Sequence, residues 1–226
     1  MGTLSVVATP IGNLGDITLR AIDVLKSCDA IACEDTRVTA KLLARFEIQK
    51  PLLVYHARSG RIASTRILQG LSEGKHIALV TDAGTPGISD PGSELVREVR
   101  ERLGDEVRID AIPGPSALGA ALSIAGVPTH EFVFYGFLPH KKGRQTLLKE
   151  ISESERTSIF YESPHRIEKA LASLAELLSE NKKVTVLREL TKMHETVVAG
   201  TAEEMAAHFT SHPGEVRGEF VVIVSA

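Results

Sequence analysis

Two carboxylates in one loop rich in glycine and proline are the groups of this sequence best suited to chemistry. Asp82 and Asp90 bracket the segment Asp-Ala-Gly-Thr-Pro-Gly-Ile-Ser-Asp. Carboxylates serve as general acids and bases, and glycine lets backbone amides approach a ligand closely. The alternative is an ordinary connection between a strand and a helix, but most of those have roughly 2–6 residues. The two acids therefore mark a candidate ligand site.

The segments around this loop predict a strand before it and a helix after it. Residues 76–80 (His-Ile-Ala-Leu-Val) form an apolar run typical of a strand buried in a parallel sheet. Asp90 suits the N-cap of a helix, and Leu95 and Val99 begin the apolar stripe of that helix. Ligands of α/β proteins bind where strands open into such loops, outside their carboxyl ends.

Two further loops, residues 9–16 and 113–116, are also rich in glycine and proline, and each follows a short apolar run. Because the loops that follow parallel strands lie at one edge of the sheet, the three loops predict a single pocket. The sequence has no Gly-Lys-Ser/Thr of a phosphate-binding loop, and its first loop does not match GxGxxG. The eight histidines lack metal-ligand spacing, so no metal site is expected.

Basic residues gather in two places. Arg37, Lys41 and Arg45 recur every four residues and share one face of a predicted helix, which indicates either phosphate contact or a solvated face. The cluster His-Lys-Lys-Gly-Arg at 140–144 overlaps residues 136–143, which we interpret as a linker between two domains. That cluster indicates nucleic-acid contact or simply a soluble linker.

Charged side chains also follow two predicted strands of the second half, at residues 162–166 and 188–195. A surface ion-pair network is one interpretation. Because each cluster directly follows a strand, a shared polar site is the other.

Size and composition limit the class of protein. A chain of 226 residues can form one large domain or two small ones. Its net charge of −3 argues against bulk-charge binding of nucleic acid but permits a local basic patch. Cys28 and Cys33 do not form a disulfide framework. We expect neither a signal peptide nor a membrane span. We therefore expect the protein to be cytoplasmic.

Several motifs together resemble the tetrapyrrole methylase superfamily. The motifs that resemble its N-terminal domain are Thr-Pro-Ile-Gly-Asn-Leu at 9–14, Glu-Asp-Thr-Arg at 34–37, Asp-Ala-Gly-Thr-Pro at 82–86 with Asp-Pro-Gly at 90–92, and Pro-Gly-Pro-Ser at 113–116. The motifs that resemble one branch, which methylates ribosomal RNA, are Phe-Tyr-Glu-Ser-Pro-His-Arg at 160–166, Arg-Glu-Leu-Thr-Lys at 188–192 with Glu195, and Gly-Glu-Phe-Val at 218–221.

This resemblance implies an α/β fold of two domains, residues 1–128 and 129–226, with S-adenosylmethionine in the cleft between them. It also implies a homodimer that methylates the ribose 2′-hydroxyl of one cytidine in the decoding region of small-subunit (16S) rRNA. One departure is at residues 56–59, where His-Ala-Arg-Ser replaces the acidic, asparagine-containing stretch common in relatives.

The chemistry of methyl transfer suggests roles for named residues. A sulfonium methyl group is already electrophilic, so the enzyme must align the nucleophile and help a weakly acidic hydroxyl to lose its proton. Asp82, Asp90 and Glu189 are the candidates to accept that proton. The resemblance assigns the cofactor to Pro10, Gly84, Thr85, Pro86, Ser116 and Ala117. Candidates for RNA contact are Arg37, Lys41, Lys141, Lys142, Arg144, His165 and Arg166.

Two alternatives use the same pocket. A small-molecule C-methyltransferase acting on a tetrapyrrole would not need the basic cluster at 140–144. A nucleotide-binding regulator would bind the cofactor without methylating any RNA. A knotted RNA methylase is less compatible, because the loops fall in the first 120 or so residues.

Overall fold

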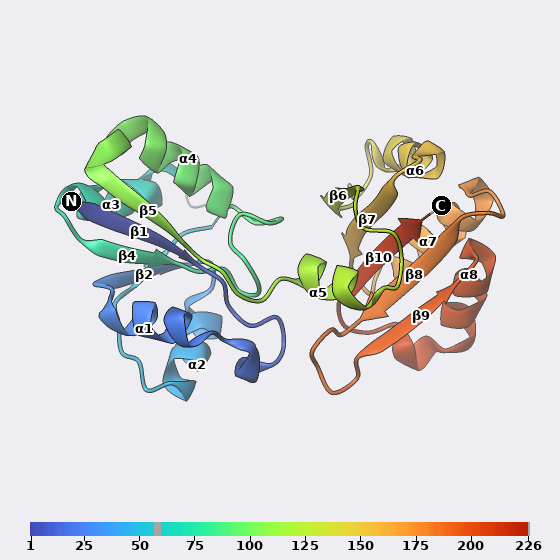
Figure 1. Cartoon of the computed structure of the whole chain (residues 1–226), viewed down its shortest axis with the longest axis horizontal. Coiled ribbons are helices and arrows are strands. Elements are labelled where there is room, and N and C mark those ends of the chain that lie inside the picture. The colour runs from blue at the N-terminus through green and yellow to red at the C-terminus, as the bar shows by residue number, and fades with distance from the viewer. Residues whose placement is uncertain (57–59, 226) are drawn as a thin grey trace. The chain divides into compact units, whose positions relative to one another are not determined.

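The computed structural model describes residues 1–56 and 60–225, so most of the departure at 56–59 lies outside the described residues. The chain forms two compact units, Met1–Ser116 and Ala117–Ala226. Each unit contains a five-stranded sheet with helices (Figure 1). The predicted organisation as two α/β domains is confirmed, although the division falls earlier than residue 128. No helix in the described ranges is long and apolar enough to cross a bilayer.

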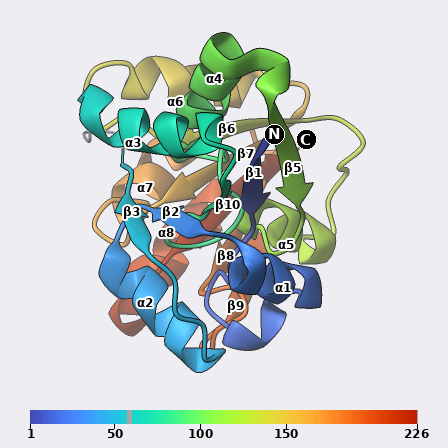
Figure 2. The same ribbon diagram turned by 90° about the vertical axis from the view of Figure 1, so that its left-hand side faces the viewer.

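The first unit is a parallel sheet covered by helices on both faces (Figures 1 and 2). Its strand order is β3-β2-β4-β1-β5. One apolar cluster joins the sheet to α1 and α2, and another joins it to α3 and α4. The elements are β1 (Gly2–Val7), η1 (Leu14–Asp16), α1 (Leu19–Ser27), β2 (Ala30–Cys33), α2 (Thr36–Arg45), β3 (Leu52–Val54), α3 (Gly60–Ser72), β4 (His76–Leu79), α4 (Gly92–Leu103), η2 (Gly104–Glu106) and β5 (Val107–Ile112).

Burial on both faces explains the short apolar runs of this sheet. All four residues of β2 are buried, as are three of the four residues of β4. Cys28 and Cys33 lie in the apolar cluster beneath α1 and α2, unpaired, and burial raises the pKa of both thiols. Buried thiols of this kind are unreactive.

The second unit has a mixed sheet in the order β6-β7-β10-β8-β9, in which only β6 and β7 are parallel. Helices α6, α7 and α8 share one apolar core with one face of this sheet, and α5 contacts β10. The elements are α5 (Ala117–Ile124), β6 (Phe132–Phe137), α6 (Arg144–Glu153), β7 (Thr157–Glu162), α7 (Ile167–Leu177), β8 (Lys183–Arg188), β9 (Thr196–Gly200), α8 (Ala202–Ser211), η3 (Pro213–Glu215) and β10 (Phe220–Ser225).

The interpretation of residues 136–143 as a linker between domains is wrong. Gly136 lies inside β6, and the segment that follows leads to α6 of the same unit. Gly136 has a φ of +63°, and the pairing of β6 with β7 shifts register between Phe134 and Phe137. The glycine therefore marks a β-bulge rather than the end of a domain.

Candidate active site

Three loops of the first unit meet at the carboxyl edge of its sheet. Thr9, after β1, exchanges backbone hydrogen bonds of 2.9 and 3.0 Å with Gly84, after β4. The Thr9 hydroxyl also donates to the carbonyl of Thr81 at 3.1 Å. Thr85 donates from Oγ1 to the carbonyl of Pro115, after β5, at 2.9 Å. The predicted convergence of the three loops is confirmed.

Glycines permit this close approach of the loops. Gly84 has a φ of +84°, in the left-handed region that favours glycine. A Cβ at position 92 would lie only 2.8 Å from the Gly87 nitrogen, and one at position 114 would lie 3.1 Å from the Ala8 Cβ. Larger residues at these two positions would push neighbouring backbone segments apart.

The structure places the two acids of the central loop in different roles. Asp90 Oδ1 accepts from the backbone nitrogens of Gly87 and Gly92 at 2.7 and 2.8 Å, so this carboxylate shapes the loop and the start of α4. The predicted cap is displaced by one residue, since Pro91 occupies the N-cap position. Asp82 is exposed, and its Oδ1 accepts from the Asp35 nitrogen at 3.1 Å. Asp82 is therefore the more accessible of the two.

Glu34 is a third carboxyl group at this edge that the sequence interpretation did not single out. It follows β2, and its Oε1 accepts from the Thr81 hydroxyl at 2.7 Å. Burial raises the pKa of Glu34, and the charges of Asp82 and Asp90 raise it further, against the lowering effect of Thr81. Its position directly after a buried strand of the same sheet was the available signal.

The basic stripe of α2 is exposed as predicted. Arg37, Lys41 and Arg45 are all exposed on this helix. Arg37 forms an ion pair of 2.6 Å with Asp35, and its hydrogen bonds lower the pKa of that carboxyl to about 2. Arg37 therefore has an acidic partner already, and phosphate contact by this stripe stays a prediction.

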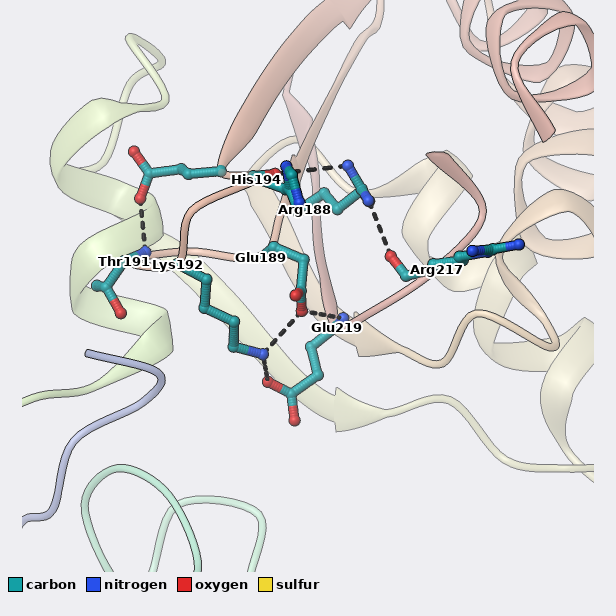
Figure 3. Close-up of polar contacts among 8 residues, drawn as sticks. Arg188, Glu189, Thr191, Lys192, His194, Arg217 and Glu219 are labelled. Carbon is teal, nitrogen blue, oxygen red and sulfur yellow. Dashed lines mark hydrogen bonds and ion pairs between the residues drawn. The ribbon is translucent and has the colours of Figure 1, made fainter. Parts of the chain in front are cut away.

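In the second unit, Glu189 lies in a network of internal contacts (Figure 3). Its Oε1 accepts from Lys192 Nζ at 2.7 Å and from the Glu219 nitrogen at 3.0 Å. Burial would raise the pKa of Glu189, but these hydrogen bonds outweigh burial and lower it. A carboxylate held in this way is a weak proton acceptor, so the arrangement favours a structural role.

The loop between β8 and β9 is held by several such contacts (Figure 3). The Arg188 guanidinium donates to the carbonyls of Arg217 and His194, and Glu195 accepts from the Thr191 nitrogen. Glu189 and Thr191 have φ angles of +53° and +66°, in a backbone region that residues other than glycine rarely adopt. The polar cluster predicted at 188–195 is therefore, in the structure, a hydrogen-bonded network that fixes this loop.

The structure contradicts a surface role for Arg144. Its side chain is 8% exposed, and Nη1 donates to Glu162 Oε2 at 3.0 Å. Arg166 pairs with the other oxygen of Glu162 at 2.7 Å and is 17% exposed. The guanidinium groups stabilise the buried carboxylate and join α6 and α7 to β7. Lys141, Lys142 and His165 are exposed, and RNA contact by these residues stays a prediction.

The residues assigned to a cofactor lie in or beside the converging loops. Pro10, Gly84 and Pro86 are buried, whereas Thr85, Ser116 and Ala117 are half-buried. Within the described ranges, no group of three histidine, cysteine or acidic side chains is arranged to hold a metal ion.

Comparisons with known proteins agree with this architecture. Residues 3–206 match the family of tetrapyrrole (corrin/porphyrin) methylases. The chain is 46% identical to ribosomal RNA small subunit methyltransferase I of Xylella fastidiosa over 99% of this chain and 81% of that protein.

Solved structures show the same fold at low identity. The methyltransferase CobJ superposes with a TM-score of 0.73 at 19% identity, covering 100% of this chain and 94% of that one. Uroporphyrin-III C-methyltransferase from Thermus thermophilus, complexed with S-adenosyl homocysteine, superposes with a TM-score of 0.66 at 19% identity. The match covers 99% of this chain and 97% of that one. Taken with the match over residues 3–206, the parallel sheet and its three joined loops show that this chain belongs to the tetrapyrrole methylase family.

Proposed function

We propose that this protein methylates small-subunit ribosomal RNA in the bacterial cytoplasm, at the ribose 2′-hydroxyl of a cytidine in the decoding region. The structural observation that carries the proposal is the convergence of the loops after β1, β4 and β5. The 46% identical relative, which is named as a methyltransferase of this RNA, supports the choice of substrate. A homodimer remains part of the proposal.

S-adenosylmethionine is the methyl donor that the family indicates. The residues at the loop edge fit this group, because Gly114 is exposed beside the converging loops and has no side chain that would block a ligand. Carboxylates at the same edge suit a cationic sulfonium better than a phosphate. Pro10, Gly84, Thr85, Pro86, Ser116 and Ala117 would hold the cofactor, which supplies an electrophilic methyl group. Its location between the two lobes stays a prediction.

The protein must align the ribose hydroxyl and receive its proton. In-line attack needs the oxygen about 3 Å from the methyl carbon, in a site that excludes water. Among the three predicted acids, Asp82 is the exposed one, and its carboxylate accepts from the Asp35 nitrogen. We assign to Asp82 the role of accepting this proton, with Glu34 beside it. Lysines such as Lys141 and Lys142 would bind phosphates and orient the RNA.

The substrate is tested by offering labelled S-adenosylmethionine with two acceptors. Small ribosomal subunits from a strain that lacks the gene should become labelled, and ribose mapping should locate the methyl group on a cytidine. A porphyrinoid should not. Label on the porphyrinoid would favour the tetrapyrrole enzyme, which is supported by the family match and by solved structures that share the fold at 19% identity. Cofactor binding without any labelled RNA would favour the regulator.

The proton acceptor is tested with Asp82→Asn, Asp90→Asn and Glu189→Gln. Asn at position 82 can still accept from the Asp35 nitrogen, so the loop should keep its shape. We expect Asp82→Asn to lower kcat roughly 10²- to 10⁴-fold while cofactor affinity stays within a few fold. Asn at position 90 can likewise still accept from the Gly87 and Gly92 nitrogens, so Asp90→Asn should change turnover and cofactor affinity little. Unchanged turnover of Asp82→Asn would rule out the assignment.

A further inference from the structure

Three aromatic rings form a continuous group on one face of the second sheet, opposite its helical core. Tyr161, on β7, has the ring of Phe134 at 4.9 Å and an angle of 67°, and the ring of Phe137 at 5.4 Å and 66°. Neighbouring Phe160 belongs to the core under α6–α8, so Tyr161 faces the other way. Its hydroxyl lies against the backbone of Leu118 in α5. We call Phe134, Phe137 and Tyr161 the aromatic platform.

The bulge at Gly136 creates this platform. Residues three apart in a regular strand point to opposite faces. Here Phe134 pairs with Ile159 and Phe137 pairs with Tyr161, so the register shift brings both phenylalanines to the same face. Phe137 is nevertheless 54% exposed. Burying a phenylalanine stabilises a fold by roughly 1.5–3 kcal/mol, so a bulge that leaves one exposed is not explained by the stability of the unit.

The surroundings of the platform are basic rather than acidic. Exposed His140, Lys141 and Lys142 follow β6 after two intervening residues, and neither lysine has an ion-pair partner in the described part of the chain. The nearby carboxylate of Glu219 is bound by Lys192 at 2.8 Å. Burial raises the pKa of Tyr161 to about 12, so its hydroxyl carries no charge at neutral pH.

We propose that the aromatic platform binds an unpaired base of the RNA substrate, which stacks on the exposed ring of Phe137 while Lys141 and Lys142 contact the adjoining phosphates. Single-stranded RNA is recognised by this combination of aromatic rings and basic groups. The platform also touches α5 at Leu118, next to Ala117, a predicted cofactor residue. This inference rests on the proposed function.

The test measures binding of a short unstructured RNA oligonucleotide that carries one 2-aminopurine base. Stacking on Phe137 should quench its fluorescence. Phe137→Ala should remove the quenching and weaken binding about 5- to 100-fold, with unchanged salt dependence because no charge is lost. Phe137→Trp should restore both. The matched control is Phe132→Ala, which removes another exposed ring from the opposite end of β6; it should change affinity less than twofold.

Each other outcome decides against the proposal or separates it from the proposed function. Normal RNA binding and quenching by a folded Phe137→Ala protein would overturn the stacking role. The stacking role would also be overturned if sedimentation showed a change in the mass of the Phe137→Ala protein that accounts for its loss of binding. The platform would then be a contact between two copies of the chain. If the wild-type protein quenches the base but labels no small subunit, the proposed function fails while the platform stands.

Discussion

A single carboxyl group, Glu34, shows how the loop edge combines stability and chemistry. The group is half-buried beside two other acids, and burial and their charges raise its pKa. A carboxyl whose pKa is raised by folding holds its proton more tightly in the folded protein. Its contribution to stability therefore falls as pH rises from the ordinary pKa through the raised one. Carboxyl groups with such shifts are typical of functional sites.

Glu34→Gln should therefore stabilise the protein at neutral pH, because glutamine can still accept from Thr81 and carries no charge. We expect a gain of roughly 0.5 kcal/mol, limited by solvent screening. Thermal unfolding at several pH values should show the gain disappear in acid, where Glu34 is already protonated. Glu180→Gln, at an exposed position of the second unit, should give no such pattern. A loss of stability at neutral pH would contradict the argument.

The sequence predicted which acidic residues lie at strand ends better than it predicted the hydrogen-bond partners of their side chains. The sequence pointed to Asp82, Asp90 and Glu189 because acids at strand ends are often functional. It could not show that Asp90 binds two backbone nitrogens, or that Glu189 binds Lys192 and a backbone nitrogen. Those partners depend on the exact turns of the two loops, and for Glu189 also on a nitrogen 30 residues away. The same limit explains Arg144, whose partner Glu162 lies on another element.

At the scale of elements, the loop between β8 and β9 depends on its contact with the turn before β10. Gly218 in that turn has a φ of +86°, and a Cβ there would collide with the Glu189 carboxyl group. Gly218→Ala should therefore cost at least about 2 kcal/mol, from the left-handed backbone and the displaced carboxylate together. Chemical denaturation measures this loss.

Two other glycines of the same unit separate the causes. Gly126 has a φ of +66° with open space around it, so Gly126→Ala reports the backbone cost alone. Gly214 has open space and no such φ, so Gly214→Ala should change stability by less than about 0.5 kcal/mol. Combining Gly218→Ala with Glu189→Ala should recover part of the loss. Equal losses for Gly218→Ala and Gly126→Ala would exclude the collision.

The elements themselves were largely predictable, and the errors have physical causes. Strands such as β2 and β4 are short apolar runs because both faces of their sheet are buried. Gly136 was assigned to a linker because a glycine after an aromatic run indicates a break, whereas here it forms a bulge. Only the pairing with β7 distinguishes the two, and that pairing is not local.

At the scale of the whole molecule, the boundary between the units shows a further limit of sequence. Residues 117–124 are apolar and small, and they join the second unit through contact with β10 and Tyr161. Their composition permits close packing but does not show against which sheet. The predicted boundary at residue 128 therefore placed α5 in the wrong unit.

The charge of the whole chain determines how it can bind RNA. Acidic residues outnumber basic ones by 29 to 26, so general attraction to phosphate is weak and local groups must supply it. Each phosphate neutralised on a single strand contributes about 0.7 to the slope of log affinity against log salt. Replacing Lys141 and Lys142 together by alanine should therefore reduce that slope by about 1.4, the sum of two such contributions.

A variant with the same change in net charge provides the control. Lys26 and Lys183 are exposed on other elements, and their double alanine variant should leave the slope almost unchanged. The slope is obtained from RNA binding at several salt concentrations. If the two double variants lower it equally, attraction is spread over the surface and the loop after β6 has no special part. If only Lys141 and Lys142 matter, a nearly neutral protein directs RNA to one loop.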